Sequence, residues 1–228
     1  MHYLIHGDYH LASRNYLVSL IEQEKKNKRE IIRLDGVKTT LNELIQAAAS
    51  NSLFGNEKTI VAENFFSRQK SNEQQQILEW LKSYDNTNTL ILWESKSIGK
   101  VLQRSLPQKT QVKEFKTPAL VFKLVEQISP KNKSQALGTL ETVLQKEPAE
   151  FLFAMICRQI RLLTIIKGGA EVKGAPWMVG KLKKQASDFT LEQLLTNYQK
   201  LYRLDKQIKT GQTIMPLSWH LSVWLSEL

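Results

Sequence analysis

The sequence is poor in cysteine, glycine and proline, and it lacks long apolar runs. It has a single cysteine, Cys157, so no internal disulfide can form, which suits a reducing cytoplasm. Ten glycines and six prolines among 228 residues exclude collagen-like and low-complexity classes. No stretch approaches ~18 consecutive apolar residues, so we expect no transmembrane helix and no membrane contact. Residues 1–10 lack the basic start and long apolar run of a secretory signal.

Acidic residues are also fewer than basic ones. The chain has 32 Lys and Arg against 22 Asp and Glu, which gives a net charge of +10. This surplus favours polyanionic partners such as nucleic acid, although solubility alone would also explain it. Residues 1–116 hold 17 basic and 13 acidic side chains, and residues 117–228 hold 15 and 9. Because the surplus is spread over both halves, a contact with nucleic acid would use a folded surface.

Up to residue 116, short apolar runs alternate with amphipathic stretches. The expected strands are 3–6, 30–35, 59–63, 89–93 and 111–115, and the expected helices between them are 11–24, 41–48 and 71–81. Strands that alternate with helices require crossover connections, which place the strands parallel and cover the sheet on both faces. The pattern therefore predicts an α/β domain with a mostly parallel sheet over residues 1–116.

From residue 117 onward, only helical spacing remains. The expected helices are 118–128, 132–146, 148–167, 176–187, 190–209 and 216–227. The helix that Pro148 opens is apolar on nearly all sides, so we expect it at the centre of a bundle. Residues 117–228 are therefore predicted to form an all-α domain.

Patterns for catalysis or metal binding are scarce. His2, His6 and His10 crowd the N-terminus, but no cysteine or carboxylate cluster with metal-ligand spacing accompanies them. Carboxylates are scattered, so nothing supports a paired acid and base. We expect no catalytic residue, no metal and no cofactor.

The turn after the first strand has the position of a phosphate-binding loop but not its residues. A loop of the form G-x-x-x-x-G-K-[ST] would start at Gly7, and Ala12, Ser13 and Arg14 then replace the second glycine, the lysine and the hydroxyl residue. The third strand ends at Glu63 without the consecutive acidic pair that polarises magnesium and water. An inactive relative of nucleotide-binding folds, or an unrelated α/β fold, fits better than an ATPase, so we expect no enzyme.

A bulky apolar pair follows the second helix. Ser52, Leu53 and Phe54 precede a glycine and the charged segment 56–58. One interpretation is a loop that tucks both apolar side chains into the core. The other is an exposed plug that fills a partner's pocket, the usual form of an interface hot spot.

Eight segments cover most of both ends of the chain in a distinctive order: 3–8, 34–36, 52–55, 58–64, 89–92, 153–163, 176–186 and 204–211. Together they resemble the delta subunit of bacterial DNA polymerase III, a clamp-loader component. Their order and spacing carry the resemblance together with the degenerate phosphate loop. Family members usually have a helical lid domain before the collar domain, and this chain resembles a short form that lacks it.

The resemblance implies a fold and a role. It implies a degenerate AAA+-like domain over 1–116 and a helical, collar-like oligomerisation domain over 117–228. It also implies that Ser52, Leu53 and Phe54 contact the sliding clamp and help to open it for loading onto DNA. The partners implied are the sliding clamp, the ATPase subunits of the clamp loader and primed DNA within a hetero-oligomer.

The resemblance also implies contacts with DNA. The resemblance implies that Lys181, Lys183 and Lys184 reach DNA inside the assembly, although a solvated helix face explains these lysines equally well. The alternative function is a stand-alone nucleic-acid-binding module with a vestigial nucleotide-binding fold. Tight DNA binding without any partner, with a steep dependence on salt, would favour that alternative.

Overall fold

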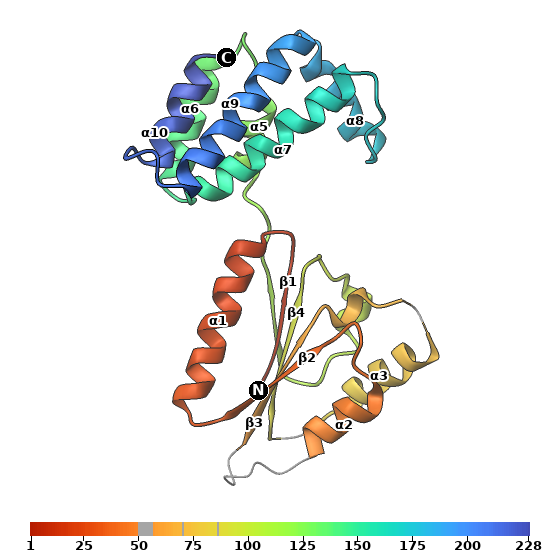
Figure 1. Ribbon diagram of the computed structural model, residues 1–228. Helices are drawn as coiled ribbons and strands as arrows, with labels where there is room; N and C mark the ends of the chain where they lie inside the picture. Colours follow the sequence, from red (N-terminus) through yellow and green to blue (C-terminus); the bar gives the residue numbers. More distant parts are fainter. Residues whose placement is uncertain (50–56, 70, 86) are drawn as a thin grey trace. The chain divides into compact units, whose positions relative to one another are not determined.

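The computed structural model describes residues 1–49, 57–69, 71–85 and 87–228. The chain divides into two compact units, Met1–Thr117 and Pro118–Leu228 (Figure 1). Residues 115–118 are all that lies between the last strand of the first unit and the first helix of the second.

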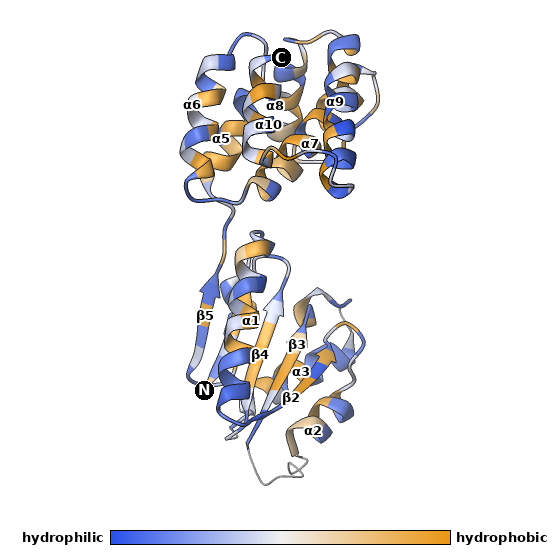
Figure 2. Cartoon of the chain, turned by 60° about the vertical axis from the view of Figure 1, so that its left-hand side comes forward, coloured by the Kyte–Doolittle hydropathy of each residue, from blue (hydrophilic) through white to orange (hydrophobic). Residues whose placement is uncertain are grey.

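A five-stranded parallel sheet forms the first unit. Its strands are β1 (His2–His6), β2 (Glu30–Asp35), β3 (Lys58–Glu63), β4 (Thr89–Glu94) and β5 (Thr110–Glu114), in the spatial order β2-β3-β4-β1-β5. Every neighbouring pair is parallel. The apolar strands β3 and β4 lie inside the sheet, and the polar strand β5 lies at one edge (Figure 2). Burial on both faces explains why β4 reads as a continuous apolar run.

Helices cover both faces of this sheet. Helix α1 (His10–Lys26) lies on one face, and α2 (Leu41–Ala49) and α3 (Asn72–Ser83) lie on the other (Figure 1). A hydroxyl side chain caps the start of α2 and of α3. The Thr40 hydroxyl accepts from the Glu43 amide, and the Ser71 hydroxyl accepts from the Gln74 amide. The sequence did not predict the single turn η1 (Phe65–Ser67) or the short helix α4 (Lys100–Gln103).

The second unit is entirely helical. It consists of α5 (Ala119–Gln127), α6 (Lys133–Leu144), α7 (Ala149–Lys167), α8 (Pro176–Ala186), α9 (Leu191–Lys209) and α10 (Leu217–Ser226). Helix α7 contacts α5, α8, α9 and α10, as its apolar surface predicts. The α/β sheet followed by a helical unit confirms the predicted fold class. Among the described residues, every helix is too short or too polar to cross a lipid bilayer.

The single thiol lies on the central helix of this bundle. Cys157 is partly buried rather than fully buried, and it packs against the apolar core. Burial, with a smaller contribution from Asp205, raises the pKa of the Cys157 thiol to about 11. A thiol that stays protonated at neutral pH is a poor nucleophile, which agrees with a structural role.

Candidate functional site

The backbone amides of the turn after β1 are hydrogen-bonded to carbonyls of two other loops. The Gly7 amide donates to the Lys96 carbonyl at 3.3 Å, and the Tyr9 amide donates to the Phe115 carbonyl at 3.1 Å. Gly7 has a φ of +129°, and a Cβ at this position would lie 1.9 Å from the Phe115 oxygen. Only glycine fits here. Two amides that a phosphate loop would turn toward a nucleotide therefore bond to carbonyls of the chain.

Arg14 occupies the carboxyl edge of the sheet next to this turn. Its guanidinium donates to the Glu63 carboxylate at 2.6 Å, and its Cζ lies 3.6 Å from the centroid of the Trp93 ring. The Trp93 indole N–H donates to the buried Ser13 hydroxyl at 3.2 Å, and that hydroxyl donates to the His10 carbonyl. Ser13 and Arg14, which replace the lysine and the hydroxyl residue of a phosphate loop, therefore bond to other residues of the protein. Arg14 pairs with Glu63 at the end of β3, and Trp93 links Ser13 to Arg14.

A buried carboxylate lies at the end of β4. Glu94 is fully buried and accepts hydrogen bonds from the Phe66 amide at 2.8 Å and the Ser67 hydroxyl at 3.3 Å. Burial raises the pKa of Glu94 to about 7, although the bonds from η1 partly offset this shift. Glu94 thereby fixes η1 to the end of the central strand. The sequence signal for this residue is a lone acid that directly follows the apolar run 90–93.

The N-terminal histidines do not come together. Nδ1 of His2 accepts from the Leu90 amide, Nδ1 of His6 accepts from the Ile98 amide, and Nε2 of His10 lies 2.7 Å from the Ser95 carbonyl. Burial lowers the pKa values of His2 and His6, which favours their neutral forms. Within the ranges that the structure describes, no three metal-ligating side chains gather at one point.

The predicted clamp-contacting residues Ser52, Leu53 and Phe54 lie outside the described residues. The described chain on either side of them is fixed by one buried side chain. Asn88 donates from Nδ2 to the Ala48 carbonyl at 3.0 Å and accepts at Oδ1 from the Lys58 amide at 2.8 Å. One amide group therefore ties the end of α2 to the start of β3.

A charged network supports the same amino edge of the sheet. Arg29, just before β2, donates to the Glu24 carboxylate at 2.8 Å and also bonds to Glu57 and Thr89. The Glu24 carboxylate accepts the Thr59 hydroxyl bond at 2.8 Å as well. The side chains that hold this edge come from α1, β3, β4 and the residues before β2 and β3. Most of these contacts join residues 28 to 60 positions apart, so no local pattern in the sequence indicates them.

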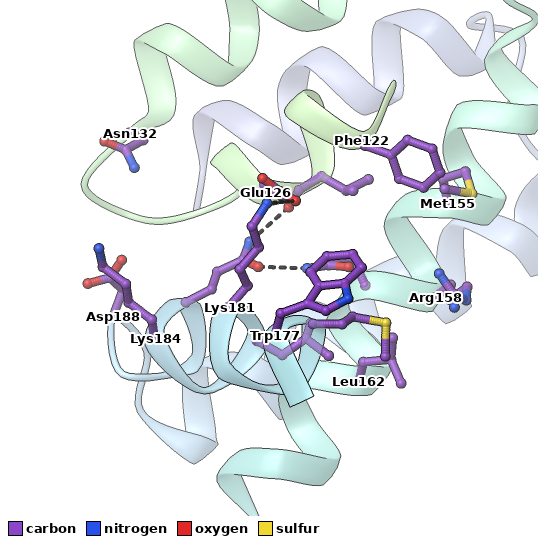
Figure 3. A pocket seen from close by; sticks show the side chains of 15 residues that line it. Phe122, Glu126, Asn132, Met155, Arg158, Leu162, Trp177, Lys181, Lys184 and Asp188 are labelled. Atoms are coloured by element: carbon purple, nitrogen blue, oxygen red, sulfur yellow. Dashed lines mark hydrogen bonds and ion pairs between the residues drawn. The ribbon is translucent and has the colours of Figure 1, made fainter. Parts of the chain in front are cut away.

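The three lysines proposed for DNA do not lie in equivalent surroundings. Lys181 pairs with Glu126 at 2.8 Å, and its Nζ lies 5.8 Å from the centroid of the Trp177 ring. Lys181 and Lys184 line a groove of about 360 Å³ between α5, α7 and α8, whereas the exposed Lys183 does not (Figure 3). Of the three, Lys183 is therefore the side chain left outside both the ion pair and the groove.

Comparison with known proteins identifies relatives of the helical unit. Residues 119–222 match the family model for the C-terminal domain of the DNA polymerase III delta subunit. For these residues, the match confirms the resemblance that the sequence indicates. Among solved structures, the chain is similar to the DNA clamp loader delta protein (YqeN) of Bacillus subtilis. The identity is 14%, the match covers 99% of this chain and 94% of that chain, and the TM-score is 0.49. A comparison with curated proteins gives no match.

Proposed function

We propose that this protein is a non-catalytic clamp-loader subunit that binds the sliding clamp and favours its open form. The observation that carries the proposal is the family match over residues 119–222. In a clamp loader of this kind, ATPase subunits and primed DNA would complete a cytoplasmic hetero-oligomer around the chain. The subunit opens the ring only to the extent that it binds the open ring more tightly than the closed one.

The closed turn after β1 supports a role without nucleotide chemistry. The Arg14–Glu63 ion pair places a fixed positive charge beside the β3 carboxylate, where an ATPase would hold magnesium. The Gly7 and Tyr9 amides are already bonded to carbonyls. Nucleotide binding would have to break these contacts, so we assign ATP hydrolysis to partner subunits.

Clamp binding is assigned to Ser52, Leu53 and Phe54. The support is positional: Asn88 and Arg29 hold the described residues on both sides of this segment at the amino edge of the sheet. A rigid frame reduces the conformational entropy that a binding segment loses when it meets a partner. Contact with DNA is assigned first to Lys183, because Lys181 is already paired with Glu126.

The test is the affinity of the purified chain for the sliding clamp of the same organism. Burying Leu53 and Phe54 in a clamp pocket is worth ~1.5–3 kcal/mol for each side chain. Replacing both by alanine should therefore weaken the complex by about two to four powers of ten. The melting temperature should stay nearly unchanged, because an exposed pair contributes little to folding.

A matched control removes two apolar side chains elsewhere. Leu11 and Val18 on α1 are 37% and 49% exposed, and their double alanine variant should bind the clamp as the parent does. If the Leu53→Ala, Phe54→Ala protein loses several kcal/mol of stability, the pair belongs to the core and the assignment fails. Tight, salt-sensitive binding of DNA by a chain that ignores the clamp would instead support the stand-alone nucleic-acid-binding module.

A further inference from the structure

The groove between α5, α7 and α8 is lined by both apolar and polar residues, and large apolar side chains are exposed at its margin. Trp177 on α8 is 68% exposed, and Phe122 on α5 is 40% exposed. Met155 and Leu162 from α7 line the groove with them. Figure 3 shows Phe122, Met155 and Trp177 around the opening. Exposed aromatic side chains gathered at a concave surface are typical of an interaction site and cost solubility otherwise.

The floor of the groove is fixed by buried amides. Gln185 donates from Nε2 to the carbonyls of Val125 and Ile128, both at 2.8 Å. Its Oε1 accepts from Nε2 of Gln159 at 2.6 Å. These bonds tie the end of α5, the middle of α7 and the last turn of α8 together. The groove is therefore formed before any partner arrives, which lowers the entropy cost of binding.

The charges around the groove are mainly positive. Arg158, Lys181 and Lys184 line it, and Lys131 pairs with the lining residue Asp188 at 2.5 Å. The second lining carboxylate, Glu126, is occupied by Lys181. In the part of the chain that the structure describes, Arg158 and Lys184 make no ion pair. Arg158 therefore lies at one end of the groove in Figure 3 without an ion pair, and Lys184 lies toward the other end, where it acts on Asp188 electrostatically but does not pair with it.

We propose that this groove binds an acidic peptide segment of a partner protein, with apolar side chains in the groove and carboxylates on Arg158 and Lys184. A helix or extended segment can place single carboxylates opposite two separated cations while its apolar residues cover Trp177 and Phe122. The proposal uses residues of the helical unit alone and does not depend on the proposed clamp-loader function.

A nucleic-acid strand fits these charges less well. Its phosphates follow one another at short, regular intervals and need a continuous track of cations. Here Glu126 and Asp188 interrupt any such track between the lysines of α8 and the loop at Lys131. An aromatic residue beside lysines would otherwise suit a stacked base, so the experiment includes a single strand as a competitor.

The experiment is a display selection of random peptides of about twelve residues on the full chain. We expect the enriched peptides to combine Asp or Glu with spaced Leu, Phe or Trp. Their affinity should fall about tenfold or more in the Arg158→Glu, Lys184→Glu variant, because each favourable contact becomes repulsive. It should also fall in Trp177→Ala and at high salt.

A charge-matched control separates this site from general electrostatics. Arg161 and Lys206 are exposed on α7 and α9 but do not line the groove. The Arg161→Glu, Lys206→Glu variant changes the net charge equally and should keep the parent's affinity for the peptides. Thermal melting confirms that each variant is folded.

Four results would overturn the proposal. The first is no enrichment on the parent over the Arg158→Glu, Lys184→Glu variant. The second is enrichment of basic or uncharged peptides. The third is an equal loss of affinity in the control variant. The fourth is a labelled oligothymidine that binds the same residues and displaces the peptides, which would make the groove a nucleic-acid site.

Discussion

Replacing Asn88 is expected to weaken both the α/β unit and the proposed clamp contact. The Asn88 side chain is 8% exposed and supplies one bond to each side of the segment 50–56. In Asn88→Ala, the Lys58 amide and the Ala48 carbonyl both lose this partner. The methyl side chain of alanine can form neither of these hydrogen bonds.

The expected magnitude follows from these two bonds. Leaving a buried backbone donor or acceptor without its partner costs ~1–3 kcal/mol for each group. Asn88→Ala should therefore lower the free energy of unfolding by about 2–6 kcal/mol. Asn88→Asp keeps the acceptor for the Lys58 amide but turns a carboxylate toward the Ala48 carbonyl. We expect it to be destabilised as well, and to recover part of its stability as pH falls and the carboxyl gains a donor.

Urea unfolding and clamp affinity, measured on the same preparations, provide the assay. Asn27→Ala is the matched control, because Asn27 is exposed and its change should stay within ~0.5 kcal/mol. At temperatures where Asn88→Ala is still folded, its clamp affinity should be reduced, since the frame around residues 50–56 has lost a fixed connection. A variant as stable as the parent would refute the reasoning about the bridge. A destabilised variant with unchanged clamp affinity would refute its link to binding.

Three further outcomes are expected. Burial raises the pKa of Glu94 from 4.5 to about 7. Between pH 4.5 and about 7, Glu94 is therefore protonated in the native state and ionised in the unfolded state. Stability should fall as pH rises through that window, and Glu94→Gln, compared with the parent by urea unfolding across pH, should abolish this component. Gly7→Ala should cost more than about 2 kcal/mol because its Cβ meets the Phe115 oxygen, whereas Gly138→Ala on α6, where nothing lies within 4 Å, should stabilise by ~0.5–1 kcal/mol. The isolated chain should hydrolyse no ATP in a coupled assay, and turnover that disappears in Arg14→Ala would contradict the reading of the Arg14–Glu63 pair.

Periodicity was sufficient to predict the long elements of this fold. Strand β2 has the expected bounds, and α7 and α9 have their last residues at the predicted positions 167 and 209. The short elements η1 and α4 were missed, because three or four residues contain less than two turns and show no period. Glu94 holds η1 in place by accepting a hydrogen bond from the Phe66 amide, 28 residues away. No local pattern in the sequence indicates such a contact.

Only part of the candidate site could be predicted from the sequence, for the same reason. The residues at 12–14 indicated a degenerate loop, because a motif has fixed local spacing. That Arg14 pairs with Glu63 depends on a contact across 49 residues. Asn88 bonds to backbone groups 30 and 40 residues away, and backbone groups are the same at every position of a sequence. Residues whose partners are distant main-chain atoms leave no signal in composition or spacing.

The strand order also sets the sequence of events when the chain is made. Strand β1 is synthesised before β4 and β5, yet these two strands are its partners, and the pairings join Tyr3 to Ile91 and His6 to Glu114. Pairings so distant along the chain form slowly and late. A nascent chain that ends before residue 110 would leave apolar β1 as an open edge, which is a template for aggregation. When β5 emerges, its charged Lys113 and Glu114 close that edge with a strand that resists further pairing.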